Sequence, residues 1–166
     1  MSKKEKDPRA QESKTYYTYE TKCGKITIIS DGNAVLAVKF GDAGVPGGKQ
    51  EASELSDLAA MQLEEYFAGK RKQFDIPIRL VGTVFQVAVW KELAAIPYGE
   101  TRSYKQIAEN IGNPKACRAV GMANNRNPIV IIIPCHRVIG SSGELVGFGG
   151  GLELKQRLLD IENSSD

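Results

Sequence analysis

The sequence predicts an α+β fold, in which a small antiparallel sheet with one helix precedes a mostly helical half. Residues 15–40 contain three runs rich in Tyr, Thr, Ile and Val, separated by turn-forming residues at 23–24 and 31–33. Residues 83–124 carry helix-capping signals and apolar residues at helical spacing. The length of 166 residues, with 42% hydrophobic residues, suits one ordinary globular domain or two small ones.

The first half is expected to follow the order β-β-β-α-β. Strands are predicted at residues 15–21, 25–30 and 34–40. The glycine-rich residues 41–50 predict a loop. At the two ends of the chain, residues 1–13 and 163–166 are expected to be disordered tails.

One helix is predicted in the first half, from about Ser53 to Ala68. Its buried face is expected to hold the apolar residues at 3.6-residue spacing, which are Leu55, Leu58, Ala59, Leu63 and Tyr66. Residues 70–80 are expected to be extended. We therefore expect an N-terminal α/β domain over residues 14–80 and a second domain over residues 81–162.

The second half is predicted to be mostly helical. Thr83 and Ser103 each begin a capping box, because a glutamine follows three residues later. The first of these helices is expected to bury Phe85, Ala88, Val89 and Leu93, and the second Ile107, Ala108 and Ile111. A Gly-containing turn at residues 112–114 then leads to a helix from Lys115 to about Asn124, which together resemble a helix-turn-helix.

The C-terminal quarter combines an apolar run, a loop and a helix. The apolar residues 129–133 predict a fully buried strand, and the six glycines of residues 140–151 predict a loop. A closing helix is marked by Leu154, Leu158 and Ile161.

Composition excludes several classes of protein. Three cysteines at unrelated spacings and a single histidine make neither a disulfide framework nor a four-ligand zinc site, so we expect no metal and no cofactor. No segment has the pattern of a signal peptide or a membrane span, so we expect a soluble, cytoplasmic monomer without membrane contact. Because the net charge is only +2, any nucleic-acid surface must be a local patch.

The helix-turn-helix carries such a local excess of positive charge. Between residues 102 and 126 Glu109 is the only acid, whereas five residues are basic, namely Arg102, Lys105, Lys115, Arg118 and Arg126. This patch would neutralise DNA phosphates, although a solvated helix face gives the same pattern. The second helix is also rich in Ala and Gly, which would let its backbone approach DNA closely or let it pack against the first helix.

Cys135 is the candidate nucleophile. It follows Pro134 at the end of the predicted strand, and it stands beside His136, the only histidine, and the cation Arg137. A thiol reacts as the thiolate, which a base or a nearby cation favours. Because neighbouring side chains of an extended chain point apart, we expect a water to bridge Cys135 and His136, with an acid such as Glu162 orienting the imidazole. The alternative is an inert core cysteine.

The segment from Pro134 to Val138, with Asn127-Pro128 before it and the glycine-rich loop after it, resembles the O6-alkylguanine-DNA alkyltransferases. Further matching motifs lie at Tyr98 to Gln106, Gly112 to Lys115, Arg118 to Val120, Gly143 to Leu145 and Leu152 to Glu162. The resemblance is strong over residues 80–162 and rests on size and layout in the first half. It implies a ribonuclease H-like α/β roll followed by a winged-helix-like helix-turn-helix.

The resemblance implies that O6-alkylguanine is flipped out of double-stranded DNA and that its alkyl group moves irreversibly to Cys135. Asn127, His136 and Glu162 would support the thiolate, and Tyr104 would help protonate the leaving guanine. Arg118 would enter the duplex where the base left it.

The same resemblance implies the contacts around these residues. Further DNA-binding residues would be Arg102, Ser103, Lys115, Ala116, Ala119, Asn124 and Arg126. The base pocket would involve Val138, Phe148 and Gly149. The chain departs from the family pattern at Phe148, where some members have tyrosine, and at Cys117 and Asn124, where small or apolar residues are expected.

Three other functions use parts of the same pattern. A module that binds alkylated bases without transfer would lack the nucleophile, which is present here. A cysteine hydrolase would need direct contact between Cys135 and His136, which their adjacency disfavours. A transcription factor would need more groups for base edges than an alanine-rich helix offers.

Overall fold

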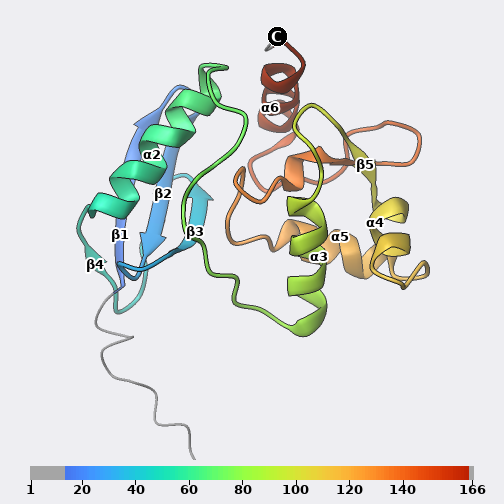
Figure 1. Cartoon of the computed structure of the whole chain (residues 1–166), viewed down its shortest axis with the longest axis horizontal. Helices are drawn as coiled ribbons and strands as arrows, with labels where there is room; N and C mark the ends of the chain where they lie inside the picture. The colour runs from blue at the N-terminus through green and yellow to red at the C-terminus, as the bar shows by residue number, and fades with distance from the viewer. Residues whose placement is uncertain (1–13, 165–166) are drawn as a thin grey trace, which may run out of the picture.

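The computed structural model describes residues 14–164, in which a sheet with one helix lies beside a helical half (Figure 1). Strands β1 (Thr15–Thr21), β2 (Gly24–Ser30) and β3 (Val35–Phe40) form the predicted antiparallel meander. The short strand β4 (Lys49–Gln50) pairs in parallel with β1 and gives the order β3-β2-β1-β4. Strand β4 was missed inside the predicted loop because two polar residues show no alternation. The predicted tail over residues 1–13 lies outside the described residues.

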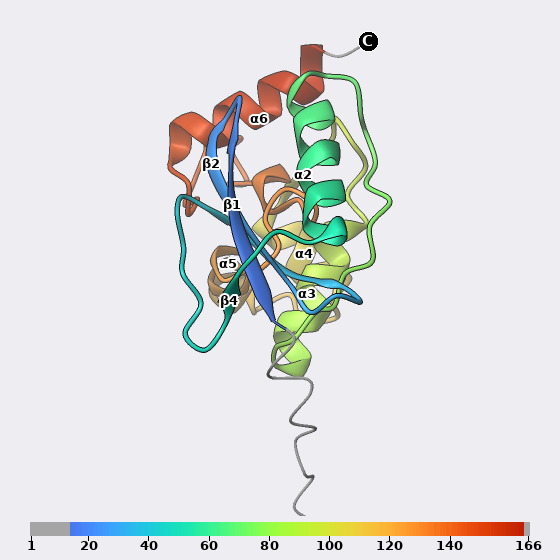
Figure 2. The ribbon, with the colours of Figure 1, turned by 90° about the vertical axis from the view of Figure 1, so that its left-hand side faces the viewer.

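Helix α2 (Glu54–Phe67) covers one face of this sheet (Figure 2). Ser53, near which the helix was predicted to begin, is its N-cap, and Ser56 completes a capping box that was not predicted. Ala59, Leu63 and Tyr66 are fully buried, whereas Leu58 is 37% exposed. The prediction for Leu58 was wrong because Leu58 is one position, or about 100°, away from the stripe that begins at Ala59.

The free edge of β3 joins the sheet to the second half of the chain. The Val38 N–H donates to the Pro128 carbonyl at 2.9 Å, and the Val130 N–H donates to the Val38 carbonyl at 3.2 Å. The predicted extended segment 70–80 pairs with the same strand only through an isolated bridge between Val35 and Ile78. The sheet therefore holds, at its edge, the backbone that leads toward Cys135.

Helices α3 (Val84–Ala94), α4 (Tyr104–Asn110) and α5 (Cys117–Asn125) form the helical half. Both predicted capping boxes are confirmed, at Thr83 and Ser103. The Trp90 Nε1–H donates to the Ala123 carbonyl at 2.9 Å and ties α3 to α5. Ala88 is exposed, against prediction, and Trp90 is buried in its place.

The third helix and the chain end differ slightly from prediction. Residues 114 and 115 form a turn, so α5 begins two residues later than predicted, without a side-chain cap. Helix α6 (Leu152–Ser164) is present as predicted but continues through residues 163 and 164, which were expected to be tail. Within residues 14–164 no helix is both long enough and apolar enough to cross a membrane.

The predicted strand at residues 129–133 is wrong, because this apolar run forms a tight turn. Ile131 has a φ of 74°, and the Ile132 N–H donates to the Val130 carbonyl at 2.9 Å, which closes a γ-turn. This conformation is strained for a β-branched residue, and Ile131 is held there at 1% exposure. Burial of alternate isoleucines made the run resemble a strand, although the run joins the sheet only at its start.

Two very short strands complete the fold. Strand β5 (Arg102–Ser103) pairs in parallel with β6 (Val138–Ile139). This pairing was not predicted, since a two-residue strand has no readable period. It joins the start of α4 to the residues that follow the turn of Cys135–Arg137.

Candidate active site

Cys135 lies in η1 (Cys135–Arg137), one turn of 3₁₀ helix between the γ-turn and β6. The Cys135 N–H donates to the Ile133 carbonyl at 2.8 Å, and the Arg137 N–H donates to the Pro134 carbonyl at 3.0 Å. The extended chain predicted here is therefore wrong. The sulfur nevertheless sits on a backbone fixed from both sides, and Cys135 is only 3% exposed.

Asn127 closes the turn in front of Cys135. Its Nδ2 donates to the Ile133 carbonyl at 2.7 Å, and its Oδ1 accepts the Ile129 N–H at 3.0 Å. The side chain is 8% exposed. Asn127 thus stabilises the strained turn at Ile131, which leads directly to Cys135 and fixes the position of its backbone.

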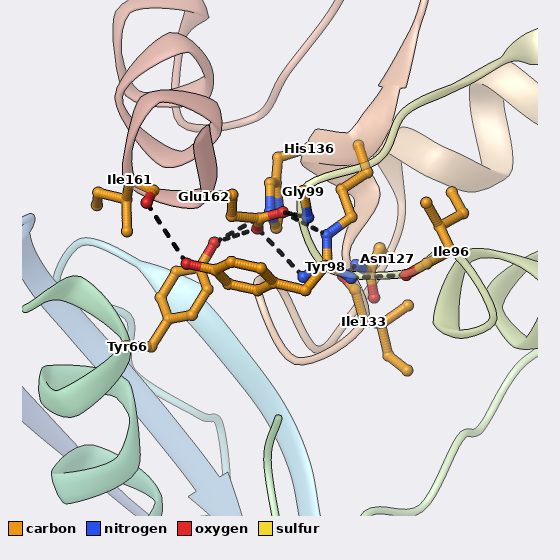
Figure 3. A network of polar contacts seen from close by, with 10 residues as sticks. Tyr66, Ile96, Tyr98, Gly99, Asn127, Ile133, His136, Ile161 and Glu162 are labelled. Atoms are coloured by element: carbon orange, nitrogen blue, oxygen red, sulfur yellow. Dashed lines mark hydrogen bonds and ion pairs between the residues drawn. The ribbon is translucent and has the colours of Figure 1, made fainter. Parts of the chain in front are cut away.

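Glu162, on α6, holds the imidazole of His136 (Figure 3). The His136 Nε2 and Glu162 Oε2 atoms are 2.5 Å apart, and both side chains are buried. The same carboxylate accepts hydrogen bonds from Arg137 Nε at 2.8 Å, from the Gly99 N–H at 3.1 Å and from the Tyr66 hydroxyl. Gly99 has a φ of 80°, a conformation that glycine adopts without strain. The structure therefore brings His136 and Glu162 together, as the sequence led us to expect.

Burial and hydrogen bonding set the charges of this pair. Burial favours the neutral form of Glu162, but hydrogen bonds from His136 and Arg137 outweigh it and lower the pKa of the carboxyl group to about 2. Burial lowers the pKa of His136, against the opposing effect of Glu162. At neutral pH the site thus holds a carboxylate and an uncharged imidazole.

The contacts of His136 identify its tautomer. Nε2 faces two oxygens, Oε2 of Glu162 and the hydroxyl of Tyr66 at 3.2 Å. Nδ1 is buried and has no hydrogen-bond partner among residues 14–164. A neutral imidazole carries one proton, so the contacts place that proton on Nε2 and leave the lone pair on Nδ1.

The positive charge that lowers the pKa of the Cys135 thiol comes from Lys155, whereas the sequence led us to expect Arg137 in this role. Arg137 makes two hydrogen bonds to Glu162 and donates Nη1 to the Ile96 carbonyl at 2.7 Å, so its charge is used elsewhere. Burial raises the pKa of Cys135, while a hydrogen bond from Asn127 and the positive charge of Lys155 oppose this rise. In the free protein the group is therefore a buried thiol that needs a proton acceptor.

Tyr104, the first residue of α4, contacts the glycine-rich loop. Its hydroxyl donates to the Val146 carbonyl at 3.0 Å, and Lys155 Nζ donates to the same carbonyl at 3.0 Å. Burial, and then the charge of Cys135, raise the pKa of Tyr104, which keeps its hydroxyl protonated. The loop is thus held by two residues, Tyr104 and Lys155, whose pKa values both depend on the charge of Cys135.

The residues expected in the base pocket lie in different surroundings. Val138 is fully buried and pairs with Arg102 between β5 and β6. The ring of Phe148 is half-buried and packs against Phe40 of the sheet, with 5.6 Å between ring centroids. Gly149 is exposed.

Most of the expected DNA-binding residues lie at the surface. Arg118, Lys115, Ala119 and Arg126 are exposed, and Arg102, Ser103 and Ala116 are half-buried. The expectation that Asn124 contacts DNA is corrected, because Asn124 is only 2% exposed and its side chain is buried. The hydroxyl of Ser103 caps α4, and Arg102 pairs with Glu100 at 3.2 Å.

Comparison with known proteins identifies the family. Residues 84–164 match the 6-O-methylguanine DNA methyltransferase DNA-binding domain, and residues 14–80 match its ribonuclease-like domain. A methylated-DNA–protein-cysteine methyltransferase of Methanosarcina acetivorans is 50% identical over 153 residues, which cover 90% of this chain and 98% of that protein. The chain belongs to the 6-O-methylguanine DNA methyltransferase family.

Further relatives of this family agree in sequence and structure. The methyltransferase of Mycobacterium leprae is 61% identical over 104 residues, which cover 63% of each chain. The crystal structure of Mycobacterium tuberculosis OGT in complex with DNA matches with a TM-score of 0.86 and 45% identity, covering 91% of this chain and 94% of that chain. The α+β architecture predicted from the sequence is thereby confirmed.

Two residues of this family member's site were not singled out from the sequence. Lys155 lies on the stripe of α6 that also carries Leu158 and Glu162, so a lysine at a buried helical position was the available signal. Tyr66 was assigned only to the core, and nothing local to α2 pointed to a partner 96 residues away.

Proposed function

We propose that this chain repairs O6-alkylguanine in double-stranded DNA by moving the alkyl group to Sγ of Cys135. The bond between the alkyl carbon and O6 breaks, and a bond between that carbon and Sγ forms. The thiol loses one proton and the released guanine gains one, so the step is balanced. The observation that carries the proposal is the buried Cys135 followed by an imidazole whose Nδ1 is free and whose Nε2 is held by Glu162.

The proton of the thiol would leave toward His136. The imidazole is neutral, because burial lowers its pKa, and its only free nitrogen is Nδ1. A water between Sγ and Nδ1 would carry the proton, since buried water commonly satisfies such orphaned atoms. Lys155 would stabilise the thiolate that forms, and Glu162 would stabilise the imidazolium.

Tyr104 would supply a proton to the departing guanine, and it would regain one through solvent when the imidazolium of His136 releases the proton taken from the thiol. Its hydroxyl is occupied by the Val146 carbonyl at 3.0 Å, so base entry requires this contact to break and the glycine-rich loop to shift. The hydroxyl stays protonated until then, because burial raises its pKa. Backbone groups near Val138 and Gly149 would bind the base edges.

The DNA surface would be the exposed face of α5 and the turn before it. Lys115 and Arg126 would contact phosphates, and Arg118 would fill the space that the flipped base leaves. The related Mycobacterium tuberculosis OGT was crystallised in complex with DNA, which supports duplex DNA as the partner. Because a thioether does not revert, each molecule would act once.

A module that binds alkylated DNA without transfer is the alternative, and it is not favoured. Such a module has no use for Cys135, and the relatives above are named methyltransferases. We also propose that residues 14–80 and 81–162 form two domains and that the protein is cytoplasmic, where its three free thiols would remain reduced.

Cys135→Ala tests the assignment of the nucleophile. The variant should lose alkyl transfer completely and keep its affinity for duplex DNA, because the DNA surface lies on α5. Cys23→Ala, which removes a thiol from the sheet half, serves as the matched control and should transfer normally. Transfer by the Cys135→Ala variant, in a single-turnover assay with labelled alkyl DNA, would show that another residue is the nucleophile.

A further inference from the structure

Tyr66 reaches from α2 into the polar network around Glu162 (Figure 3). Its hydroxyl donates to Oε2 of Glu162 and lies 3.2 Å from Nε2 of His136. The residue is fully buried. A side chain from the ribonuclease-like half therefore contacts both members of the pair on which thiol activation depends.

We propose that Tyr66 is a positioning residue for alkyl transfer: its hydroxyl holds the Glu162 carboxylate against Nε2 of His136 and adds a second acceptor there, which maintains the His136 tautomer able to accept the thiol proton. The proposal rests on the proposed function for its consequence, but its structural claim concerns His136 alone. Through Tyr66, the sheet half of the chain would contribute to activation of the thiol as well as packing against the helical half.

The protons on Tyr66, Glu162 and His136 determine which of their atoms donate and which accept. Burial, and then the charge of Glu162, raise the pKa of Tyr66, so its oxygen carries one hydrogen. That hydrogen is donated to Glu162, which is ionised and can only accept. The tyrosine oxygen then offers only lone pairs to Nε2. Both oxygens near Nε2 are acceptors, so the ring proton is held on Nε2 and Nδ1 remains free to accept.

Packing keeps the hydroxyl in this place. The Tyr66 ring contacts the rings of Phe74, Tyr98 and His136, with centroid distances of 5.6, 6.2 and 6.4 Å. Arg137 in turn lies 5.6 Å above the Tyr98 ring. The phenol is thus held by aromatic contacts that removal of the hydroxyl would leave intact.

Tyr66→Phe is the direct test, and Tyr19→Phe is its matched control. The Tyr19 hydroxyl also donates to a carboxylate, Asp57 Oδ1 at 2.6 Å, and contacts Ser56, but it lies away from the relay. Both variants lose one phenolic hydrogen bond to an acid on α2 or α6. We expect the single-turnover transfer rate of Tyr66→Phe to fall roughly tenfold and that of Tyr19→Phe to stay unchanged.

A spectroscopic measurement separates positioning from a loss of stability. His136 is the only histidine in the chain, so protein labelled with ¹⁵N-histidine gives one pair of imidazole signals. The wild type should show the Nε2–H tautomer, and Tyr66→Phe should show an increased share of Nδ1–H. The pH profile of Cys135 alkylation by iodoacetamide, without DNA, should change in Tyr66→Phe and not in Tyr19→Phe.

Two results would overturn the proposal. One is a wild-type protein with the Nδ1–H tautomer, a measurement that needs no variant to fold. The other is a Tyr66→Phe variant that matches Tyr19→Phe in transfer rate, tautomer and alkylation profile. If the wild type transfers no alkyl group, the proposed function fails, while the tautomer measurement still decides the role of Tyr66.

Discussion

Glu162 lies at the centre of the polar contacts of the site. It accepts hydrogen bonds from His136, Arg137, Gly99 and Tyr66. Arg137 balances its charge, so the imidazole does not need to be protonated to keep the cluster neutral. A neutral imidazole with a free Nδ1 is the form that can take a proton from a thiol.

The depressed pKa of Glu162 predicts a loss of stability in acid. Its folded pKa of about 2 lies below its usual 4.5, so its contribution is present above pH 4.5 and is lost as the pH falls toward 2. The shift corresponds to about 3 kcal/mol of unfolding free energy. His136, whose pKa is also lowered, acts in the same direction as the pH falls below its usual value.

Glu162→Gln should remove this acid-sensitive contribution. Urea unfolding between pH 7 and pH 3 should show a smaller loss of stability toward low pH in the variant than in the wild type. The variant should be less stable at pH 7, because Arg137 loses its partner in the interior. Parallel pH profiles for the two proteins would show that Glu162 does not have the low pKa assigned to it.

Lys155 offers a second prediction at a single residue. Its ammonium group opposes the rise in the pKa of Cys135, so Lys155→Met should raise that pKa further. Alkylation of Cys135 by iodoacetamide should then require higher pH, while stability is kept because a buried charge is removed. Lys91→Met, at an exposed position of α3, is the control. An unchanged alkylation profile would remove Lys155 from the thiol's surroundings.

At the scale of elements, the sequence predicted those helices, strands and turns that depend on interactions between residues close together in the chain. The meander, the capping boxes at Thr83 and Ser103 and the closing helix depend on residues close together in the chain. The γ-turn at Ile131 depends instead on burial and on the edge of β3, about 90 residues earlier. No local pattern could therefore separate it from a buried strand.

Helix α5 contains Arg118, the residue proposed to enter the DNA duplex. Arg118→Ala should slow repair of alkylguanine in duplex DNA by about tenfold or more, because the space left by the flipped base is no longer filled. Reaction with the free alkylguanine base should be unaffected. Arg157→Ala, at an exposed position on α6, is the control for loss of a positive charge. Equal effects of Arg118→Ala on both substrates would exclude this role.

At the scale of the whole molecule, the two halves meet at three places that matter to the site. The edge of β3 binds residues 128–130, Phe40 packs against Phe148 in the glycine-rich loop, and Tyr66 reaches Glu162. Cys135, His136, Asn127 and Glu162 could be named from sequence because motif and resemblance mark them. The contribution of Tyr66 could not, because it exists only once the halves are packed together.

The central claim is that Cys135 accepts an alkyl group from DNA once per molecule. The most direct test is an intact-mass spectrum after mixing the protein with an oligonucleotide duplex that contains one O6-methylguanine, followed by peptide mapping. We expect every protein molecule to gain the mass of one methylene unit at most, at Cys135, with an equal amount of repaired DNA. An unchanged protein mass, or repair of more DNA molecules than protein molecules present, would contradict the claim.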